Sequence, residues 1–224
     1  MIDWQPLLLT LQLALVTTIV LFLLAVPLAN LLASAEGRWK PIVETLISMP
    51  LVLPPTVVGF YLLLAFSPNS AVGSLLNNIF GLRLAFSFEG LVVASLIYSL
   101  PFMVQPLQAG FSAIPKSLIE AAETMGKTKW QILIKILLPN MKPAVITAIV
   151  LSFAHTIGEF GVVLMIGGNI PGETRVASIA IYDQVEALNY NLANTYSLIL
   201  VVLSFSILFL IYSINRNSRK RITL

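Results

Sequence analysis

The chain has 224 residues, of which 58% are hydrophobic and only 10% are charged. Because soluble domains carry about 25% charged residues, this composition excludes an ordinary soluble domain and predicts an all-α integral membrane protein. The absence of cysteine excludes disulfides and thiolate chemistry, and a single histidine excludes a histidine-rich metal site within one chain. The net charge of +3 becomes informative only when the charges are placed along the chain.

The first predicted membrane span covers residues 7–33, inside a stretch without charge from 4 to 35. About 20 apolar residues suffice to cross the hydrocarbon. The alternative is a cleaved signal peptide, which has a basic start and a shorter apolar run. Here the only charged residue before the run is the acidic Asp3, and the run is too long for a signal peptide. We therefore expect a retained span with a kink near Pro27.

The second predicted span, 42–66, contains Pro50, Pro54 and Pro55, so a single straight helix is not expected. Broken backbone at membrane depth is tolerated where it is buried in protein or lines a cavity. Two interpretations stay open: a kink packed against its neighbours, or a pore-lining segment. Residues 67–89 are expected to form a loop with one short helix, because Gly, Pro and Asn recur there.

The third predicted span, 90–112, leads into the one long amphipathic and charged interval of the chain, residues 116–139. This interval is predicted to form two short helices between membrane spans. Local pattern alone favours a plain helical hairpin on the membrane surface.

Three signals define these two short helices. Ser117 and Glu120 have the S-x-x-E spacing of a capping box and predict the start of the first. Gly126 suits the left-handed residue that ends a helix. Thr128 and Gln131 repeat the capping-box spacing and predict the start of the second.

The fourth predicted span, 141–166, holds the only histidine, His155, and a carboxylate four residues later, Glu159. Helical residues four apart face each other, so these two side chains are expected to pair at the end of the span, beside a turn at 158–161. A zinc site needs three or four ligands. An intramembrane metal enzyme is therefore the weaker interpretation.

The last part of the chain contains a second large loop, 167–192, with a short amphipathic helix expected over 176–188. The fifth predicted span, 193–215, is free of charge, and basic residues follow it. The whole chain, 1–224, is expected to form a single membrane domain.

Lysine and arginine placement orients the five spans. The regions 36–41, 113–142 and 215–224 share one side and hold two, five and four of these residues. The opposite side holds only Arg83 and Arg175. We therefore expect a cytoplasmic C-terminus, a cytoplasmic 116–139 segment and an N-terminus outside.

Residues 116–139 resemble the EAA loop of type I ABC importer permeases, which has the form E-A-A, three residues, G, nine residues, I-x-L-P. Every defined position of that motif matches: Glu120, Ala121, Ala122, Gly126, Ile136, Leu138 and Pro139. In that family the loop is the coupling helix, which docks in a groove on a cytoplasmic ATPase. The resemblance makes the plain surface hairpin the weaker interpretation.

Further matches extend the resemblance over nearly the whole chain and make it most similar to the molybdate-transport permease group. They are residues 49–55 (MPLVLPP), 158–161 (GEFG) and 169–175 (NIPGETR), the last followed by Ile181 and Tyr182. The first two recur loosely in sulfate permeases. The resemblance thus implies import of molybdate or tungstate, with sulfate, thiosulfate or another oxyanion as the alternative and a transport-free membrane scaffold as a weaker one.

The resemblance also implies an assembly in the cytoplasmic (inner) membrane of a prokaryote. It comprises a homodimer of this subunit, two ATPase subunits below and an extracytoplasmic oxyanion-binding protein above, with no nucleic acid. The chain has no G-x-x-x-x-G-K-[ST] loop. ATP and Mg are therefore expected on the ATPase, with no cofactor and no catalytic residue on this chain.

A dianion needs a shielded path through hydrocarbon, because burying an unpaired charge costs many kcal/mol. Hydroxyl groups suit such a path without trapping the ion, although ordinary helix packing is the alternative for each. The candidates are Thr56, Thr147, Ser152 and Thr156. The candidates for outer contact with the binding protein are Glu159, Pro171, Gly172, Glu173, Thr174 and Arg175.

Overall fold

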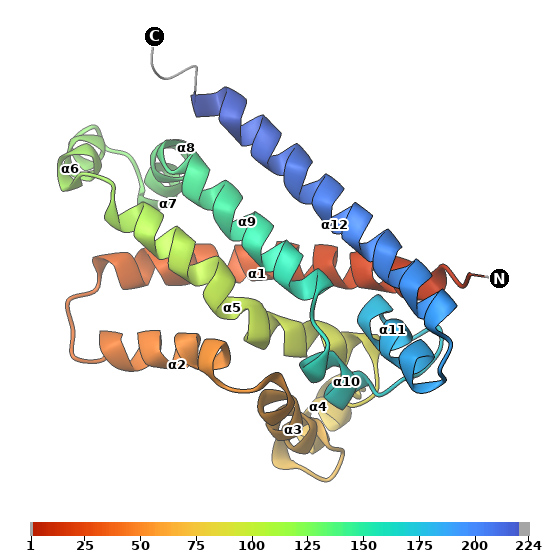
Figure 1. The fold of residues 1–224 in the computed structure, drawn as a ribbon. Helices are drawn as coiled ribbons and strands as arrows, with labels where there is room; N and C mark the ends of the chain where they lie inside the picture. The colour runs from red at the N-terminus through yellow and green to blue at the C-terminus, as the bar shows by residue number, and fades with distance from the viewer. Residues whose placement is uncertain (1, 220–224) are drawn as a thin grey trace.

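The structure, a computed structural model, describes residues 2–219, which form helices and loops without a strand among them (Figure 1). In chain order these are α1 (Gln5–Ser34), α2 (Lys40–Val52), α3 (Pro55–Phe66), α4 (Ala71–Phe80), α5 (Phe88–Ser112), α6 (Lys116–Thr124), α7 (Lys129–Ile132), the π-helical η1 (Leu133–Leu137), α8 (Leu138–Asn140), α9 (Lys142–Ile157), α10 (Gly161–Gly167), α11 (Ala177–Glu186) and α12 (Tyr190–Arg219). Lys220 and Arg221, two of the basic residues used to orient the chain, lie outside the described residues.

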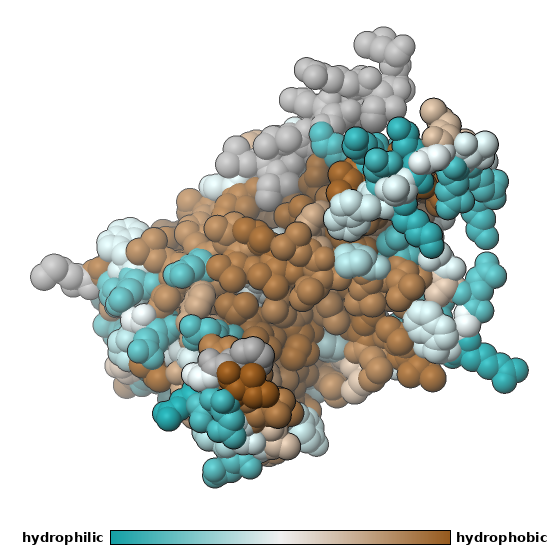
Figure 2. Space-filling view, turned by 180° about the vertical axis from the view of Figure 1, so that it is seen from behind, coloured by the Kyte–Doolittle hydropathy of each residue, from teal (hydrophilic) through white to brown (hydrophobic). Residues whose placement is uncertain are grey.

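Within the described residues, three helices are long and apolar enough to cross a membrane: α1, α5 and α12. Two bent pairs are further candidates. The chain bends by 113° between α2 and α3, and by 83° between the stretch Lys129–Asn140 and α9. Figure 2 shows apolar residues filling the middle of one face, with hydrophilic residues gathered toward opposite ends. This is the surface expected of a protein surrounded by lipid.

The bend in the second predicted span follows from its prolines. Helix α2 ends at Val52, and Leu53 is extended with a ψ of 138°. A residue before proline is disfavoured in the helical region, and Pro54 lacks the amide that a continuing helix needs. Pro55 then occupies the first position of α3, where its fixed φ suits a helix start.

The interval 141–166, predicted as one span, contains two helices. Helix α9 ends at Ile157, and α10 begins only at Gly161. A Cβ atom added at Gly161 would lie 2.7 Å from the Cβ atom of Pro55. The chain therefore breaks where α10 turns to pack directly against the start of α3.

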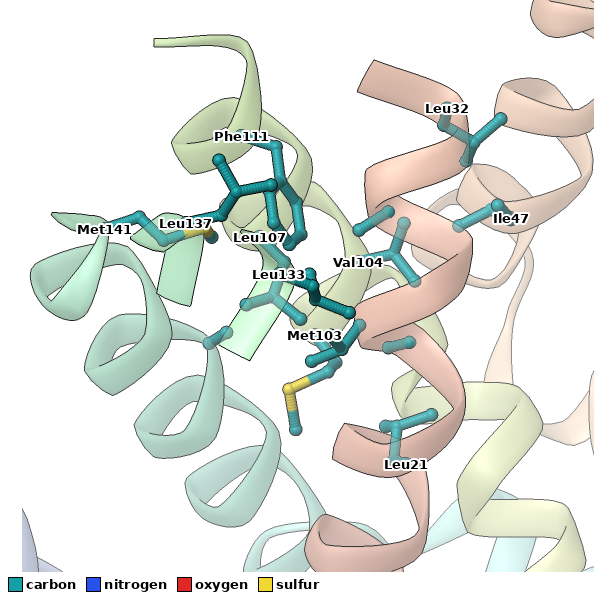
Figure 3. Close-up of a cluster of buried hydrophobic side chains, with 14 of the residues drawn as sticks. Leu21, Leu32, Ile47, Met103, Val104, Leu107, Phe111, Leu133, Leu137 and Met141 are labelled. Carbon is teal, nitrogen blue, oxygen red and sulfur yellow. The ribbon is translucent and has the colours of Figure 1, made fainter. Parts of the chain in front are cut away.

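The main hydrophobic core joins α1, α5 and the run from α7 to the start of α9 (Figure 3). Ala25 and Ala29 of α1 are fully buried, and such small residues let neighbouring helices approach closely. Leu133 and Leu137 of η1 enter the same core beside Leu107 of α5. The segment between the third and fourth spans is thus packed against two membrane helices rather than hanging free.

Contacts between distant parts of the chain group its loops at two ends. Lys116 Nζ lies 3.6 Å from Glu36 Oε1, so the first loop adjoins the start of α6. At the other end, the Tyr196 hydroxyl donates to the carbonyl of Asp3, near the N-terminus. Figure 1 shows α6 and α8 at one end of the molecule and α11 with the N-terminal residues at the other.

Candidate functional site

Residues 116–139 fold as two helical pieces joined by a left-handed turn. Gly126 follows the end of α6 with a φ of 72°. Its amide donates to the carbonyl of Glu123 (2.9 Å), and the amide of Lys127 donates to that of Ala122 (3.1 Å). These two bonds form a Schellman motif, which satisfies the last helix carbonyls and requires a residue that tolerates positive φ. The predicted turn at Gly126 is confirmed.

The two predicted capping boxes have different outcomes. The Thr128 hydroxyl accepts from the amide of Gln131 (3.3 Å), and the Gln131 side chain accepts from the amide of Thr128 (3.1 Å). The second box is therefore confirmed. The first is wrong, because α6 begins at Lys116 directly after Pro115, and Ser117 already lies inside its first turn without capping it.

The residues of the E-A-A motif divide between the surface and the core. Ala122 is 3% exposed, and Ile136 and Leu138 are half-buried against the main core. The motif residues at the surface are Glu120, Ala121, Gly126 and Pro139. Two large apolar side chains of the same segment, Met125 and Trp130, are 76% and 66% exposed. Exposed apolar groups beside polar ones suit a protein partner.

A pocket of about 530 Å³ lies where α3, α5, α9 and α10 meet. Pro55 and Thr56 border it from the break in the second span, and Glu159 and Gly161 border it from the break between α9 and α10. Broken helices at membrane depth line cavities or are buried in protein. Pro55 and Thr56 therefore border a cavity, as the pore-lining interpretation of the second span requires.

Glu159 is the buried carboxylate of this pocket, with 4% exposure. Its Oε2 atom accepts from the Ser95 hydroxyl on α5 (2.8 Å), and its backbone carbonyl accepts from the Ser178 hydroxyl on α11 (2.7 Å). Its Oε1 atom has no partner among the described residues. Glu159 thus joins the α9–α10 break to two other helices while keeping one oxygen unpaired.

The predicted pairing of His155 with Glu159 is wrong. Glu159 lies beyond the end of α9, so the four-residue helical spacing does not apply to it. The Nδ1 atom of His155 instead lies 3.0 Å from the Ser99 hydroxyl, and its ring stacks on Phe102 with centroids 3.9 Å apart. Within residues 2–219, no three histidine or carboxylate side chains group as a metal site requires.

Of the four hydroxyl residues proposed to line a path, only Thr56 borders the pocket. The buried Thr156 donates to the carbonyl of Ser152 (2.9 Å), and Thr147 donates to that of Pro143 (2.9 Å). The Ser152 hydroxyl is buried without a partner among the described residues. The contact of Thr147 is that of ordinary helix packing, whereas the Thr156 hydroxyl also lies 3.1 Å from the Ser99 hydroxyl on α5.

Sequence reasoning missed Ser95 and Ser99, which hold the polar groups of the pocket. Both are fully buried on α5, four residues apart. Small hydroxyl residues at helical spacing inside an apolar span commonly bond across helices. The four-residue spacing of Ser95 and Ser99 was therefore the sequence signal that could have identified them.

The outer loop after α10 is held from within by Thr174, which is 0% exposed. Its hydroxyl donates to the carbonyl of Gly167 (2.7 Å) and accepts from the amide of Ile170 (3.1 Å). The expectation that Thr174 and Glu159 contact an outer partner is therefore wrong, because both side chains are buried.

The rest of that loop does reach the surface. Pro171, Gly172 and Glu173 are exposed. Arg175 is half-buried, where its guanidinium lies 3.6 Å from the carboxylate of Asp183. Of the candidates for outer contact, the three residues at this tip are therefore the exposed ones.

Residues 21–224 match the protein family described as the binding-protein-dependent transport system inner membrane component. The chain belongs to this family. The "Molybdenum transport system permease protein ModB" of Azotobacter vinelandii is 46% identical to this chain. The alignment covers 96% of this chain and 95% of that protein. The "Sulfate transport system permease protein CysT" of Escherichia coli (strain K12) is 32% identical, covering 82% of this chain and 66% of its own.

Solved structures share the fold of this family member. A bacterial ABC transporter involved in the import of alginate aligns with a TM-score of 0.77 at 20% identity, covering 95% of this chain and 78% of that one. The inward-facing methionine ABC transporter MetNI aligns with a TM-score of 0.72 at 20% identity, covering 95% and 94%. The predicted fold, that of type I ABC importer permeases, is confirmed.

Proposed function

We propose that this chain is the permease subunit of an ATP-driven importer for molybdate, and that tungstate uses the same path. The observation that carries the proposal is that sequence identity is higher to a molybdenum permease than to a sulfate permease. The molybdenum permease of A. vinelandii is 46% identical, whereas the sulfate permease of E. coli is 32% identical over a smaller share of the chain. Import of sulfate or another oxyanion is the second candidate, because that relative also aligns over 82% of the chain.

We further propose that residues 1–224 form one domain of five spans in the cytoplasmic membrane, with the N-terminus outside. The charge asymmetry supports this orientation. It is also supported by the two groups of loops, since Lys116 adjoins Glu36 at one end and Asp3 adjoins Tyr196 at the other. The bent pair α2 and α3 then counts as one span, and the fourth span, 141–166, begins with α9 after the cytoplasmic residues 116–139.

The partners follow from the two ends. At the cytoplasmic end, Glu120, Ala121 and the exposed Met125 form a face for an ATPase subunit, which supplies ATP and Mg. At the outer end, the tip at Pro171 to Glu173 meets an oxyanion-binding protein. The solved alginate transporter was crystallised with its periplasmic protein, which supports a partner of that kind here. We propose two copies of this chain and two of the ATPase.

The test is uptake by proteoliposomes that hold this chain with its ATPase and binding protein. Molybdate should enter in an ATP-dependent manner, tungstate should compete with it, and a large excess of sulfate should not. Preferential uptake of sulfate would establish the second candidate instead. Both candidate functions would be refuted if the loaded binding protein did not stimulate ATPase activity and no oxyanion was taken up.

A further inference from the structure

A row of polar side chains joins helices α2 and α5 at a place that belongs neither to the pocket nor to residues 116–139. The side-chain nitrogen Nε2 of Gln105 donates to the Ser48 hydroxyl (3.1 Å), and that of Gln108 donates to Glu44 Oε1 (2.6 Å). Two residues of each helix thus face each other in two successive rungs, although 57 and 64 residues separate them in the chain.

This row is open rather than buried. Gln105 is exposed, and the Glu44 side chain is 37% exposed. Amides and carboxylates that face lipid are costly, and polar groups inside a membrane segment normally face a protein interior or a water-filled cavity. Another side of α2 carries the residues that suit lipid, since Ile42 and Leu46 are 63% and 60% exposed. Helix α2 therefore has one side that suits lipid and a separate polar side that suits protein or a water-filled cavity.

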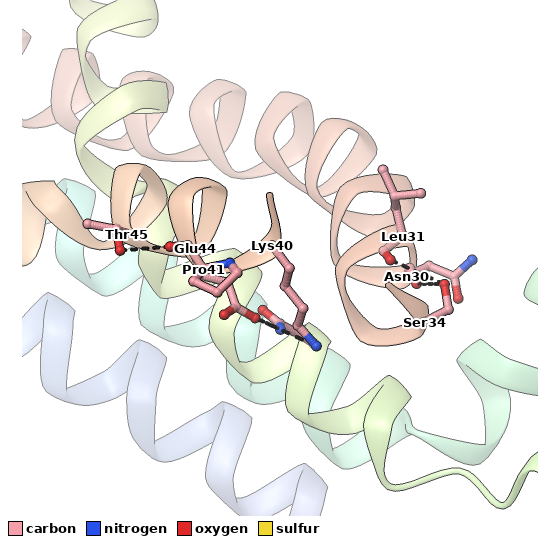
Figure 4. A network of polar contacts seen from close by, with 8 residues as sticks. Asn30, Leu31, Ser34, Lys40, Pro41, Glu44 and Thr45 are labelled. Carbon is pink, nitrogen blue, oxygen red and sulfur yellow. Dashed lines mark hydrogen bonds and ion pairs between the residues drawn. The ribbon is translucent and has the colours of Figure 1, made fainter. Parts of the chain in front are cut away.

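A groove of about 550 Å³ runs along α2, where the polar Glu44, Thr45 and Ser48 share its lining with the apolar Pro41, Met49, Val52 and Leu53. Figure 4 shows Lys40, Glu44 and Thr45 in the first turns of α2. Lys40 Nζ lies 3.9 Å from Glu44 Oε1. Lys40 offsets the negative charge of Glu44, and Gln108 donates a hydrogen bond to it, so that Glu44 repels an anion less than a free carboxylate would.

The row continues toward the pocket along one face of α5. Tyr98, which borders the pocket, lies seven residues before Gln105, and seven residues are close to two helical turns. Phe102 lies between them and stacks on the pocket residue His155, with ring centroids 3.9 Å apart. The pocket therefore borders the same face of α5 that carries Gln105, with an aromatic pair between them, and Gln105 reaches from that face to Ser48 in the groove on α2.

We propose that Ser48, Gln105 and Gln108 form the inner half of the path taken by the imported oxyanion. This proposal rests on the proposed function. Because Gln105 donates to Ser48, the Ser48 hydroxyl hydrogen stays available to donate to a passing oxyanion. Gln108 uses one of its two amide hydrogens on Glu44. Neutral N–H and O–H donors stabilise a dianion while holding it less tightly than a lysine or arginine would.

The first test compares Gln105→Leu/Gln108→Leu with Gln12→Leu, which makes the same change at an exposed position of α1. Molybdate uptake and ATPase activity are measured in proteoliposomes that hold the complete transporter. We expect the double variant to import about tenfold less molybdate, because hydrogen bonds to a charged group are lost. Stimulation of its ATPase by loaded binding protein should persist, and Gln12→Leu should match the wild type.

A second measurement does not depend on activity. The chain has no cysteine, so single thiols can be introduced at Ser48 and, two residues away on the same helix, at Leu46. A charged, water-soluble thiol reagent should modify Ser48→Cys and block its uptake, while Leu46→Cys in lipid should stay unmodified.

The outcomes separate the two proposals. Normal uptake by the double variant, or equal labelling at both positions of α2, would overturn the inner path while leaving the permease function intact. Failure of the wild type to import any oxyanion would overturn the proposed function itself. Labelling confined to Ser48→Cys, with lost uptake in the double glutamine variant, would establish the path.

Discussion

Replacing Gly126 by valine tests whether the turn between α6 and α7 transmits ATPase movement. Gly126 has a φ of 72°, and no atom lies within 4 Å of an added Cβ atom. The cost is therefore backbone strain alone, about 1–2 kcal/mol for a β-branched residue in a left-handed conformation. Strain of this size lowers the population of the native turn by about 5- to 30-fold.

The expected result is a complex that assembles but loses ATPase stimulation by loaded binding protein. Gly81→Val is the matched control, since Gly81 ends α4 with a φ of 65° and also has open space around its Cβ position. The same strain there should leave stimulation unchanged. Gly126→Asn should retain most of the activity, because asparagine tolerates the left-handed region. If Gly126→Val behaves as the wild type, or Gly81→Val is equally uncoupled, the turn has no special role in coupling.

Three further outcomes follow from the structure. Glu120→Lys reverses an exposed charge of the coupling face, and ATPase binding should weaken about tenfold in a pull-down titration at constant salt. Gly161→Val places a Cβ atom 2.7 Å from the first residue of α3. Its cost of about 1–3 kcal/mol should lower the melting temperature in detergent, whereas Gly158→Ala, with no neighbour closer than 3.8 Å, should not. A thiol at the exposed Glu173 should cross-link to the binding protein, and capture of the ATPase there instead would contradict the proposed orientation.

Local signals in the sequence predicted much of the helix pattern. Pro54 and Pro55 predicted the break in the second span, because proline acts on its immediate neighbours. Thr128 and Gln131 predicted a helix start, because a capping box likewise depends only on residues close together in the chain. Ser117 failed as a cap because Pro115 starts the helix two residues earlier. Two local signals competed there, and the spacing alone did not rank them.

The pocket was harder to predict, because long-range contacts decide it. The partner of Glu159 is Ser95, 64 residues earlier. No pattern around Glu159 indicates that partner, and the helical spacing pointed instead to His155. Thr174 illustrates the same difficulty, since a hydroxyl in a Gly- and Pro-rich loop is normally expected at the surface. Its burial depends on how the loop folds over Gly167.

The π-helical turn η1 makes chain length critical in residues 116–139. Each residue of an α-helix turns the chain by about 100°. Ile136 and Leu138 are half-buried against the core, whereas Lys135 and Pro139 face outward. Removing one residue between Gly126 and Ile136 would rotate the apolar side chains out of the core and bring the lysine toward it. The nine residues of that interval therefore set an angle, so that their number matters as well as their identity.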